Sequence, residues 1–538
     1  MRYRLPLWGG LLLMSTSAVQ ARTVTARPVA ERVGRYGVWE LALEVANPVA
    51  DNPFTEVTVR GTFTPPKEGP FAADGFCDAA DGTRFKIRCC PEQVGEYTYR
   101  VEYRDPAGQE VFTGRFLSEP SDHPGPVVAC PKHPHHFLYA GSGQHFYHLG
   151  YTAYHLLDVT NSEAQIRRAL DTWAEWGFTK VRFLLAGYPR DTDTRPTGPS
   201  GQGGLEQWKM PNYGAPPGEV NPLPAWQGEP HHYDFTRFNV EYWQKVERVV
   251  AYMQEKGLVA TCIFTIEKQG LPKEYGALTE HEKRFYRYAI ARLAAFSNVW
   301  WDLGNEHNEY RGTDWGNEMG RLVKEWDPYD RLTSAHAYAE WLYGDADWTD
   351  FIITQQYGTP PQVNAWALKY RPLNKPYVNE EYGYEGTVDK PGHGHHVEWV
   401  RKCHWAIALA GGYATYGDWF DGAFYTGHLG RGRAPAQLRH LRAFFEELPY
   451  WELEPHNDLV SEENFCLAKP GEVYVVYLPN GGTVTVNLTD AAGQFSAQWF
   501  DPRTGEEGQV QPVRGGAERP FTAPSEADWV LLLARGGR

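Results

Sequence analysis

Apolar and polar residues follow three successive patterns along the chain. From about residue 25 to 120 they alternate in short runs, such as 38–43, 56–63 and 96–103, with Pro-, Gly- and Asp-rich breaks between the runs. A period of two is typical of strands that bury one face. This region is therefore predicted to be an antiparallel β-sandwich, with a hairpin turn at 105–108.

From about residue 129 to 455, short apolar runs alternate with segments whose apolar residues recur every three or four positions. This rhythm favours a (β/α)8 barrel with one or two long loops. The strands are expected at 146–150, 179–185, 258–265, 299–304, 332–336, 351–355, 376–380 and 412–416. Helices are expected at 162–176, 237–256, 279–296, 316–326 and 396–410.

A doubly wound open sheet is the alternative for this central region. It is disfavoured because no Gly-rich phosphate loop follows the first strand, and because acidic and aromatic residues follow many strands rather than one switch point. The stretch 187–235 is long and carries aromatic residues among many Gly and Pro. Long ordered loops on a barrel face usually shape the substrate site.

From about residue 456 the chain returns to the strand pattern, in runs such as 473–478, 482–488, 496–500 and 528–533. We therefore predict a multidomain α/β and β fold, in which a central TIM barrel lies between two β-sandwich domains. The predicted boundaries are 1–21 for a signal peptide, 22–122 for the N-terminal sandwich, 123–455 for the barrel and 456–538 for the C-terminal sandwich.

The N-terminal segment has the features of a secretory signal. Arg2 and Arg4 precede an apolar run at 5–14, and small residues follow up to a plausible cleavage site after Ala21. A membrane anchor is the weaker alternative, because a span needs about twenty apolar residues. The protein is expected to be secreted or periplasmic, without a membrane span.

Composition excludes several classes of function. The 538-residue chain is 42% hydrophobic and has a formal net charge of −15, which does not favour binding to nucleic acid or to an acidic membrane surface. Seven cysteines leave at least one unpaired, and no C-x-x-C motif indicates a zinc or redox site. Pairing of Cys77 with Cys89 or Cys90 is one option. The short histidine clusters at 133–136 and 393–396 lie among Pro and Gly, so neither a metal nor a cofactor is predicted.

Two glutamates carry the candidate chemistry. Glu306 follows the apolar run 299–303, and Glu381 follows the run 375–380. Carboxylates at the same end of two parallel barrel strands are the pair that hydrolysis of a glycosidic bond needs. Glu306 is predicted to be the acid/base, with Glu309 as its local competitor, and Asn305 is predicted to bind the 2-hydroxyl of the sugar.

Glu381 is predicted to be the nucleophile. Glu380, Glu385 and Asp389 are its neighbours and competitors, and alternation alone does not separate Glu380 from Glu381. Further residues at predicted strand ends are candidates for contacting the substrate or the carboxylates. They are Arg182, His336, Tyr357, Trp419, Tyr154, His155 and Glu385.

The motifs resemble a known group of enzymes. Asn305-Glu306, with Glu381-Tyr382-Gly383 further on, is similar to the retaining glycoside hydrolases of clan A, in which these motifs end the fourth and seventh strands. The segment 375–386 is more specifically similar to the apiosidase-like family of secreted bacterial glycosidases. The acid can be an aspartate there, whereas this chain has Glu306, so the resemblance implies the two-carboxylate mechanism rather than apiose as the substrate.

The flanking regions extend this resemblance over nearly the whole chain. Segments such as 52–54 and 95–99 resemble the N-terminal sandwich of that family, and 499–505 and 528–532 resemble its C-terminal collagen-binding-type β domain. The predicted function is a secreted retaining O-glycosidase acting on plant, algal or microbial polysaccharides or oligosaccharides. The alternatives are an inactive carbohydrate-binding protein on a barrel scaffold, and an adhesin that binds collagen or host matrix. The oligomeric state is not predicted.

Overall fold

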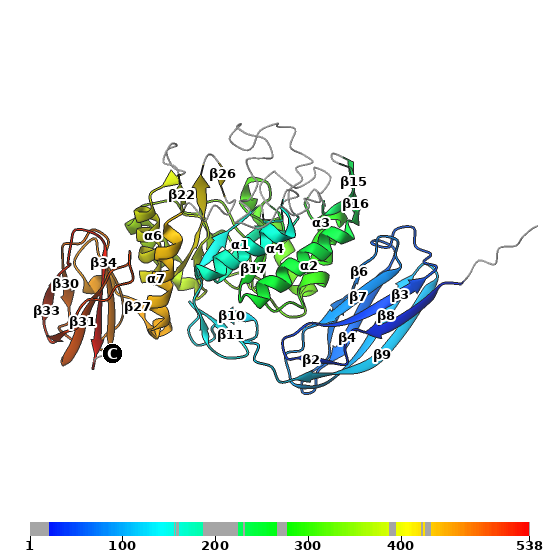
Figure 1. The fold of residues 1–538 in the computed structure, drawn as a ribbon, viewed down its shortest axis with the longest axis horizontal. Coiled ribbons are helices and arrows are strands. Elements are labelled where there is room, and N and C mark those ends of the chain that lie inside the picture. The colour runs from blue at the N-terminus through cyan, green and yellow to red at the C-terminus, as the bar shows by residue number, and fades with distance from the viewer. Residues whose placement is uncertain are drawn as a thin grey trace, which may run out of the picture.

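Figure 1 shows a row of three folded regions in this computed structural model. The structure describes residues 21–154, 156–157, 161–186, 224–229, 232–265, 277–386, 394–420, 423–424 and 432–536. The central region lies between an N-terminal β region, beside helices α2 and α3, and a C-terminal β region, beside helices α6 and α7 (Figure 1). The predicted fold class is confirmed.

The N-terminal region is a sandwich of two sheets, in the orders β1-β3-β7-β6 and β2-β9-β8-β4-β5. Alternate residues of β3 and β8, including Leu41, Leu43 and Val101, are fully buried between the sheets. The predicted hairpin turn is confirmed, because Asp105 pairs with Gly108 between β8 and β9. The strands are β1 Thr23–Pro28, β2 Arg32–Gly34, β3 Trp39–Ala46, β4 Thr58–Thr64, β5 Phe71–Asp74, β6 Phe76–Cys77, β7 Arg84–Cys89, β8 Gly95–Asp105 and β9 Gly108–Glu119.

The central sheet has eight parallel strands in the order β19-β18-β17-β14-β13-β24-β21-β20. In chain order this is 5-4-3-2-1-8-7-6, the neighbour order of a (β/α)8 barrel. Between the fifth and sixth strands the Ser334 hydroxyl donates to the Phe351 carbonyl at 2.7 Å. The strands are β13 Gly150–Thr152, β14 Lys180–Leu184, β17 Val259–Ile263, β18 Val299–Asp302, β19 Thr333–Ser334, β20 Ile352–Thr354, β21 Tyr377–Asn379 and β24 Tyr413–Tyr416.

The described helices of the central region agree with the amphipathic segments, with two additions. Helices α5 and α7 were not predicted, although a capping box of Thr359 and Gln362 begins α5. The helix predicted from 237 begins at Val240 instead, because 237 and 238 end strand β16. The helices are α1 Glu163–Glu175, α2 Val240–Glu255, α3 Glu280–Leu293, α4 Thr313–Trp326, α5 Pro360–Tyr370, α6 Val397–Leu409 and α7 Ala434–Glu446.

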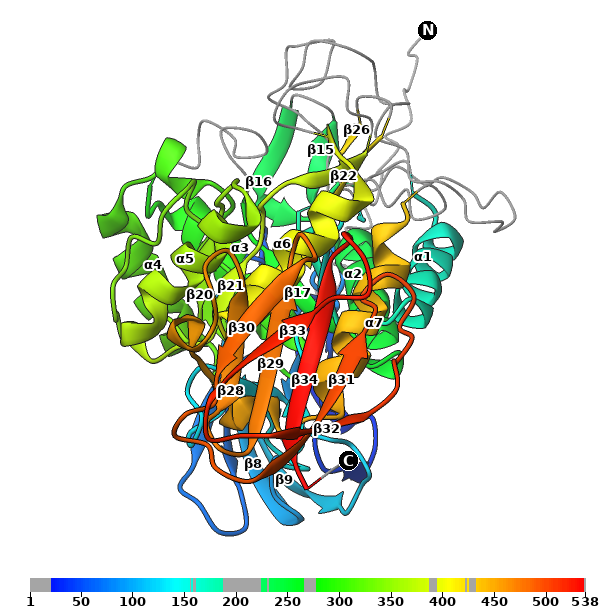
Figure 2. The same cartoon turned by 90° about the vertical axis from the view of Figure 1, so that its left-hand side faces the viewer.

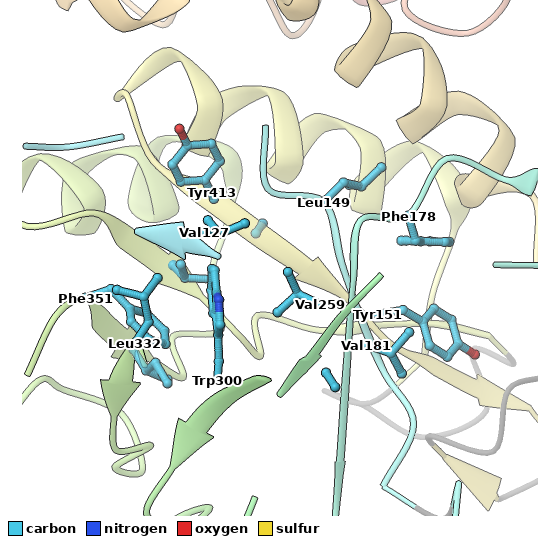
Figure 3. Close-up of a cluster of buried hydrophobic side chains, with 14 of the residues drawn as sticks. Val127, Leu149, Tyr151, Phe178, Val181, Val259, Trp300, Leu332, Phe351 and Tyr413 are labelled. Atoms are coloured by element: carbon cyan, nitrogen blue, oxygen red, sulfur yellow. The ribbon is translucent and has the colours of Figure 1, made fainter. Parts of the chain in front are cut away.

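The first barrel strand is displaced from its predicted position. The structure places it at Gly150–Thr152 rather than 146–150, and residues 145 and 146 belong to a small antiparallel sheet, β10-β11-β12, beneath the barrel (Figure 1). Val127 of this sheet lies with Trp300, Phe351 and Tyr413 in the core (Figure 3). The sheet therefore covers the end of the barrel where the strands begin. Its strands are β10 Val127–Ala129, β11 Phe137–Tyr139 and β12 His145–Phe146.

Short strands surround the opposite end of the barrel, where the barrel strands finish. The antiparallel pair β15–β16 overlaps the end of the stretch 187–235 predicted to be a long loop, and residues 187–223 and 230–231 of that stretch are outside the described part. A small sheet β23-β22-β25-β26 follows the seventh and eighth strands. These strands are β15 Trp226–Glu229, β16 His232–Phe238, β22 Tyr384–Gly386, β23 Gly394–His395, β25 Asp418–Phe420 and β26 Ala423–Phe424.

The C-terminal region combines a six-stranded sheet, β27-β28-β29-β34-β31-β32, with the pair β30–β33 (Figure 2). One face of the larger sheet packs on the barrel, where Trp405 of α6 stacks on Tyr477 with ring centroids 5.7 Å apart. Arg401 forms a buried ion pair with Asp528 at 2.6 Å. The strands are β27 Glu454–Pro455, β28 Phe465–Lys469, β29 Val473–Leu478, β30 Thr483–Asn487, β31 Gln494–Phe500, β32 Gln511–Arg514, β33 Glu518–Thr522 and β34 Trp529–Arg535.

All seven cysteines lie in the described residues, where they are buried and unpaired. The disulfide considered between Cys77 and Cys89 or Cys90 is therefore not formed. Burial raises the pKa of the Cys77 thiol to about 12, so this thiol stays protonated and unreactive at neutral pH.

Candidate active site

The two glutamates come from strands that end on the same side of the barrel. Glu306 lies four residues beyond β18, and Glu381 lies two residues beyond β21. Both strands belong to the parallel sheet, so both side chains start from its carboxyl-terminal edge. Glu306 and Glu381 are 9% and 5% exposed, which places each carboxylate at the wall of a largely buried site.

The side-chain amide of Gln355 joins the two glutamates. Its Nε2 donates to Oε1 of Glu306 at 2.7 Å and lies 3.2 Å from Oε1 of Glu381. Because one nitrogen reaches both oxygens, these oxygens are at most about 6 Å apart, close to the spacing of about 5–5.5 Å found between the carboxyl groups of retaining glycosidases. The structure therefore brings together the pair that the sequence predicted.

Glu381 is surrounded by hydrogen-bond donors. Tyr357 donates to Oε1 at 2.7 Å, Tyr384 also donates to Oε1, and Tyr154 donates to Oε2 at 3.1 Å. Burial and the charge of Glu381 raise the pKa of the Tyr357 hydroxyl well above its usual value, so Tyr357 keeps the proton that it donates. Together with Gln355, four donors face this carboxylate, an arrangement that suits its ionised form.

The backbone of Glu306 is strained. Its φ of 49° and ψ of 35° lie in the left-handed region, which costs a non-glycine residue about 1–2 kcal/mol. A short 3-10 helix, η3 His307–Glu309, follows at once, and the Glu309 amide donates to the Glu306 carbonyl at 3.0 Å. Such strain is concentrated at functional sites. Glu309, the local competitor, is exposed to solvent.

A layer of buried polar residues supports the two glutamates. Arg182 pairs with Asp302 at 3.1 Å, and its Nη2 also donates to Oδ1 of Asn305 at 2.5 Å. The Tyr154 hydroxyl lies 2.7 Å from the same Asn305 oxygen, so its single proton is shared between Asn305 and Glu381. With its oxygen taken by these donors, the amide of Asn305 is oriented so that Nδ2 remains as its donor group.

His336 connects this layer to Gln355. Its Nδ1 faces Nη2 of Arg182, and its Nε2 lies 2.9 Å from Oε1 of Gln355. Burial and the charge of Arg182 lower the pKa of His336 well below its usual value, so the ring is neutral. Since Arg182 can only donate, Nδ1 accepts and Nε2 carries the proton, which orients the Gln355 amide toward the carboxylates.

Glu380 occupies a different environment from Glu381. It forms a buried ion pair with Lys180 and accepts a hydrogen bond from Thr415. Burial would raise the pKa of Glu380, but the charges of Lys180 and Arg182 outweigh it and lower the value to about 2. The alternation of residues did not distinguish Glu380 from Glu381, but the structure does. Glu381 lies beside Glu306, and Glu380 lies in the barrel interior.

The remaining predicted site residues are Glu385, Trp419 and His155. Glu385 accepts hydrogen bonds from the backbone amides of Arg433 and Ala434 at 2.7 and 2.9 Å, so it caps helix α7 rather than pointing at the two carboxylates. Trp419 of β25 is buried and stacks on Tyr384, with ring centroids 6.2 Å apart. His155 and the competitor Asp389 lie outside the described residues.

Two residues of the site were not predicted. Gln355 and Tyr384 both contact Glu381, and Gln355 also contacts Glu306. Gln355 directly follows strand β20, so its position at a strand end was a signal that the sequence offered. Tyr384 offered no comparable signal, because its hydroxyl reaches Glu381 through a turn three residues long.

Neither a metal site nor a membrane span is found in the described part of the chain. Within it, no group of three or more His, Cys, Asp or Glu residues is placed to hold a metal ion. No helix among those residues is both long and apolar enough to cross a membrane.

Comparison with known proteins identifies the family to which the chain belongs. A family model described as "Apiosidase-like, catalytic domain" matches residues 132–419, more than half of the chain. The chain belongs to the apiosidase-like family. A model described as "Putative collagen-binding domain of a collagenase" matches residues 456–534 of this apiosidase-like protein, and a domain of unknown function matches residues 32–104. The resemblance stated from the sequence motifs is thereby confirmed.

Solved structures share the fold of this apiosidase-like protein. A crystal structure of a "putative glycoside hydrolase" from Bacteroides vulgatus ATCC 8482 matches with a TM-score of 0.74 at 22% identity, over 94% of this chain and 100% of that chain. A glycoside hydrolase family 5 structure from the same organism matches with a TM-score of 0.59 at 14% identity, over 77% of this chain and 94% of that chain. No curated protein matches the sequence. These two structures show the shared fold, and the match to the catalytic domain of the apiosidase-like family identifies the chain as a glycoside hydrolase.

Proposed function

We propose that this protein is a secreted retaining O-glycosidase, in which Glu381 is the nucleophile and Glu306 is the acid/base. The observation that supports this proposal best is the shared contact of Gln355, which limits the separation of the two carboxylate oxygens to about 6 Å. An inverting enzyme needs about 6.5–9.5 Å between its carboxyl groups, to admit a water molecule between carboxylate and sugar.

The first step forms a glycosyl-enzyme. Glu306 gives its proton to the glycosidic oxygen while the bond from that oxygen to the anomeric carbon breaks, and Glu381 attacks the same carbon from the opposite face. The four donors around Glu381 favour the anion that attacks. Asn305 donates through Nδ2 to the 2-hydroxyl of the sugar, a hydrogen bond that strengthens as positive charge develops on the ring.

The second step releases the sugar. Glu306, now a carboxylate, takes a proton from water, and the resulting hydroxide equivalent displaces Glu381 from the anomeric carbon. Two inversions give net retention of configuration. Arg182 and His336 are fully buried, so in this mechanism they position Asn305 and Gln355 instead of contacting the sugar. Trp419 and Tyr384 form an aromatic wall beside the nucleophile.

The substrate class proposed is a plant, algal or microbial polysaccharide, or an oligosaccharide released from it. Export of the protein would bring it to an extracellular or periplasmic polymer. The proposal of export rests on the signal pattern at 1–21, with its charged, apolar and small-residue segments. Detection of a mature N-terminus at Arg22 in the exported protein, by mass spectrometry, tests this part of the proposal.

The mechanism is tested by chemical rescue after a glycan-panel digestion has identified a substrate. Glu381→Ala should lose turnover, and azide should restore reaction of an activated aryl glycoside with formation of the inverted glycosyl azide. Glu306→Ala with azide should give the azide of retained configuration, because the glycosyl-enzyme still forms. Glu309→Ala is the matched control and should keep wild-type turnover. Wild-type product of inverted configuration in the NMR spectrum, or glycan binding without cleavage across the panel, would refute the proposal.

A further inference from the structure

The loop after the fifth barrel strand carries an unusual surface. Among the Phe, Tyr and Trp residues that the structure describes, Tyr338 is the one whose side chain is exposed to solvent, with 50% of its surface accessible. Leu342, on the same loop, is 41% exposed. The other exposed large hydrophobic residues of the described part are valines of the two flanking β regions. Within the described part of the barrel region, the exposed large apolar side chains therefore gather on one loop, which we call the Tyr338 ledge, residues 338–342.

The ledge is held next to the catalytic pair. The backbone amide of Tyr338 donates to Oδ1 of Asn308 at 2.6 Å, and Nδ2 of Asn308 donates to the Tyr338 carbonyl at 3.4 Å. Asn308 lies two residues beyond Glu306. The backbone amide of Gln355 donates to the Ala339 carbonyl at 3.2 Å. The ledge is therefore bound to the residue that joins the two carboxylates and to the turn that presents Glu306.

The ledge is also a fixed structure, anchored on its outer side. Glu340 forms an ion pair with Lys369 at 3.0 Å, and the indole of Trp341 donates to the Gly344 carbonyl at 2.7 Å. Ala339 has a φ of 68°, in the left-handed region that favours glycine. Strain of this kind persists only where the surroundings impose it, and it is concentrated at ligand-binding sites.

We propose that the Tyr338 ledge is the binding site for the sugar on the leaving-group side of the scissile bond. This inference rests on the proposed function, because Glu306 as acid is beside the departing oxygen. The C–H faces of a sugar ring are apolar, and an exposed tyrosine ring offers them a rigid surface with little conformational entropy to lose. The ligand class is a neutral sugar ring, contacted by the Tyr338 ring and the Leu342 side chain.

The test compares two substrates that share the transferred sugar. One is the oligosaccharide found by the digestion panel, which places a sugar on the ledge, and the other is the 4-nitrophenyl glycoside of the same transferred sugar. In Tyr338→Ala, kcat/KM for the oligosaccharide should fall about 5- to 10-fold more than kcat/KM for the aryl glycoside. Tyr338→Phe, which keeps the ring, should stay within about twofold of wild type on both.

A second readout isolates the glycosyl-enzyme step. With the aryl glycoside as donor and the leaving-group sugar as acceptor, Tyr338→Ala should transfer about 5- to 10-fold less glycosyl to the acceptor relative to water. Val510→Ala, which removes an exposed apolar side chain of the C-terminal region, should leave this partition unchanged. Equal losses on both substrates with an unchanged partition would overturn the ledge proposal while the proposed function stands. Absence of any cleavage by wild type would instead refute the proposed function.

Discussion

The carboxyl-terminal end of the barrel and the barrel interior beneath it surround two adjacent carboxylates with opposite kinds of groups. Glu381 faces three tyrosine hydroxyls and an amide, all of them neutral donors. Glu380 faces the ammonium group of Lys180, and both of these side chains are fully buried. Neutral donors stabilise an anion while leaving it able to attack, whereas a buried ion pair neutralises it. The difference shows how one strand end supplies both a reactive group and a structural one.

Removing the carboxylate at the end of the barrel should have the largest effect. Glu381→Ala should lower kcat/KM by about 10⁴-fold or more, because the glycosyl-enzyme cannot form without the nucleophile. Thermal unfolding should change little. Steady-state kinetics and differential scanning calorimetry on the same preparation check both expectations. Turnover within tenfold of wild type would contradict the assignment of Glu381.

Removing the partner of the interior carboxylate should affect stability instead. Lys180→Met leaves Glu380 buried without a countercharge, which costs about 3–5 kcal/mol of unfolding free energy. The urea midpoint, followed by tryptophan fluorescence, should fall accordingly.

The matched control for this prediction is Lys180→Met combined with Glu380→Gln. No charge is then buried, so most of the lost stability should return. A single variant that is as stable as this double variant would show that the ion pair is not needed to hold Glu380.

Gln355 sharpens the comparison because it contacts both Glu306 and Glu381. Gln355→Ala should lower kcat/KM by about 10- to 100-fold, since both glutamates lose a donor that orients them. The acid limb of the pH–rate profile should move to higher pH, which a merely structural change would not cause. Gln356→Ala, at the neighbouring amide, should cost less than about threefold. An unshifted acid limb in Gln355→Ala would argue against the bridging role.

The smallest effect concerns stability at low pH. The folded-state pKa of Glu380, about 2, is lower than its ordinary value of 4.5. A depressed carboxyl pKa contributes stability above pH 4.5, and this contribution is lost as the pH falls from 4.5 toward 2. The urea midpoint of wild type should therefore decline over this range more steeply than that of the Lys180→Met, Glu380→Gln double variant. Parallel declines would contradict the prediction.

The sequence predicted that the two flanking regions are β domains, but it did not predict how each of them contacts the barrel. The N-terminal sandwich has a hydrophobic core of its own and meets the barrel through buried charges, in which Arg88 and Arg292 both pair with Glu247 at 2.8 and 2.6 Å. The C-terminal sheet shares its apolar face with the barrel core, through residues such as Tyr477 and Leu532. Alternation predicts strands in both cases, but it does not reveal which neighbour covers each face.

Most strands and helices of the barrel could be predicted from the sequence alone. Apolar runs of four to eight residues separated by amphipathic segments identify parallel strands and helices, and Glu306 and Glu381 were recognisable because each lies where such a run gives way to a loop. These signals are local in the sequence, so they can be recognised without knowing which residues each strand or helix contacts.

What required the tertiary structure is the direction of each side chain beyond the strand ends. Glu381 points toward Glu306, Glu380 into the barrel interior and Glu385 to the start of α7, although all three lie within six residues. Gln355 and Tyr384 joined the site for the same reason. These directions depend on groups that are distant in the chain, such as Lys180 and the amides of 433 and 434, and only folding brings those groups within hydrogen-bonding distance.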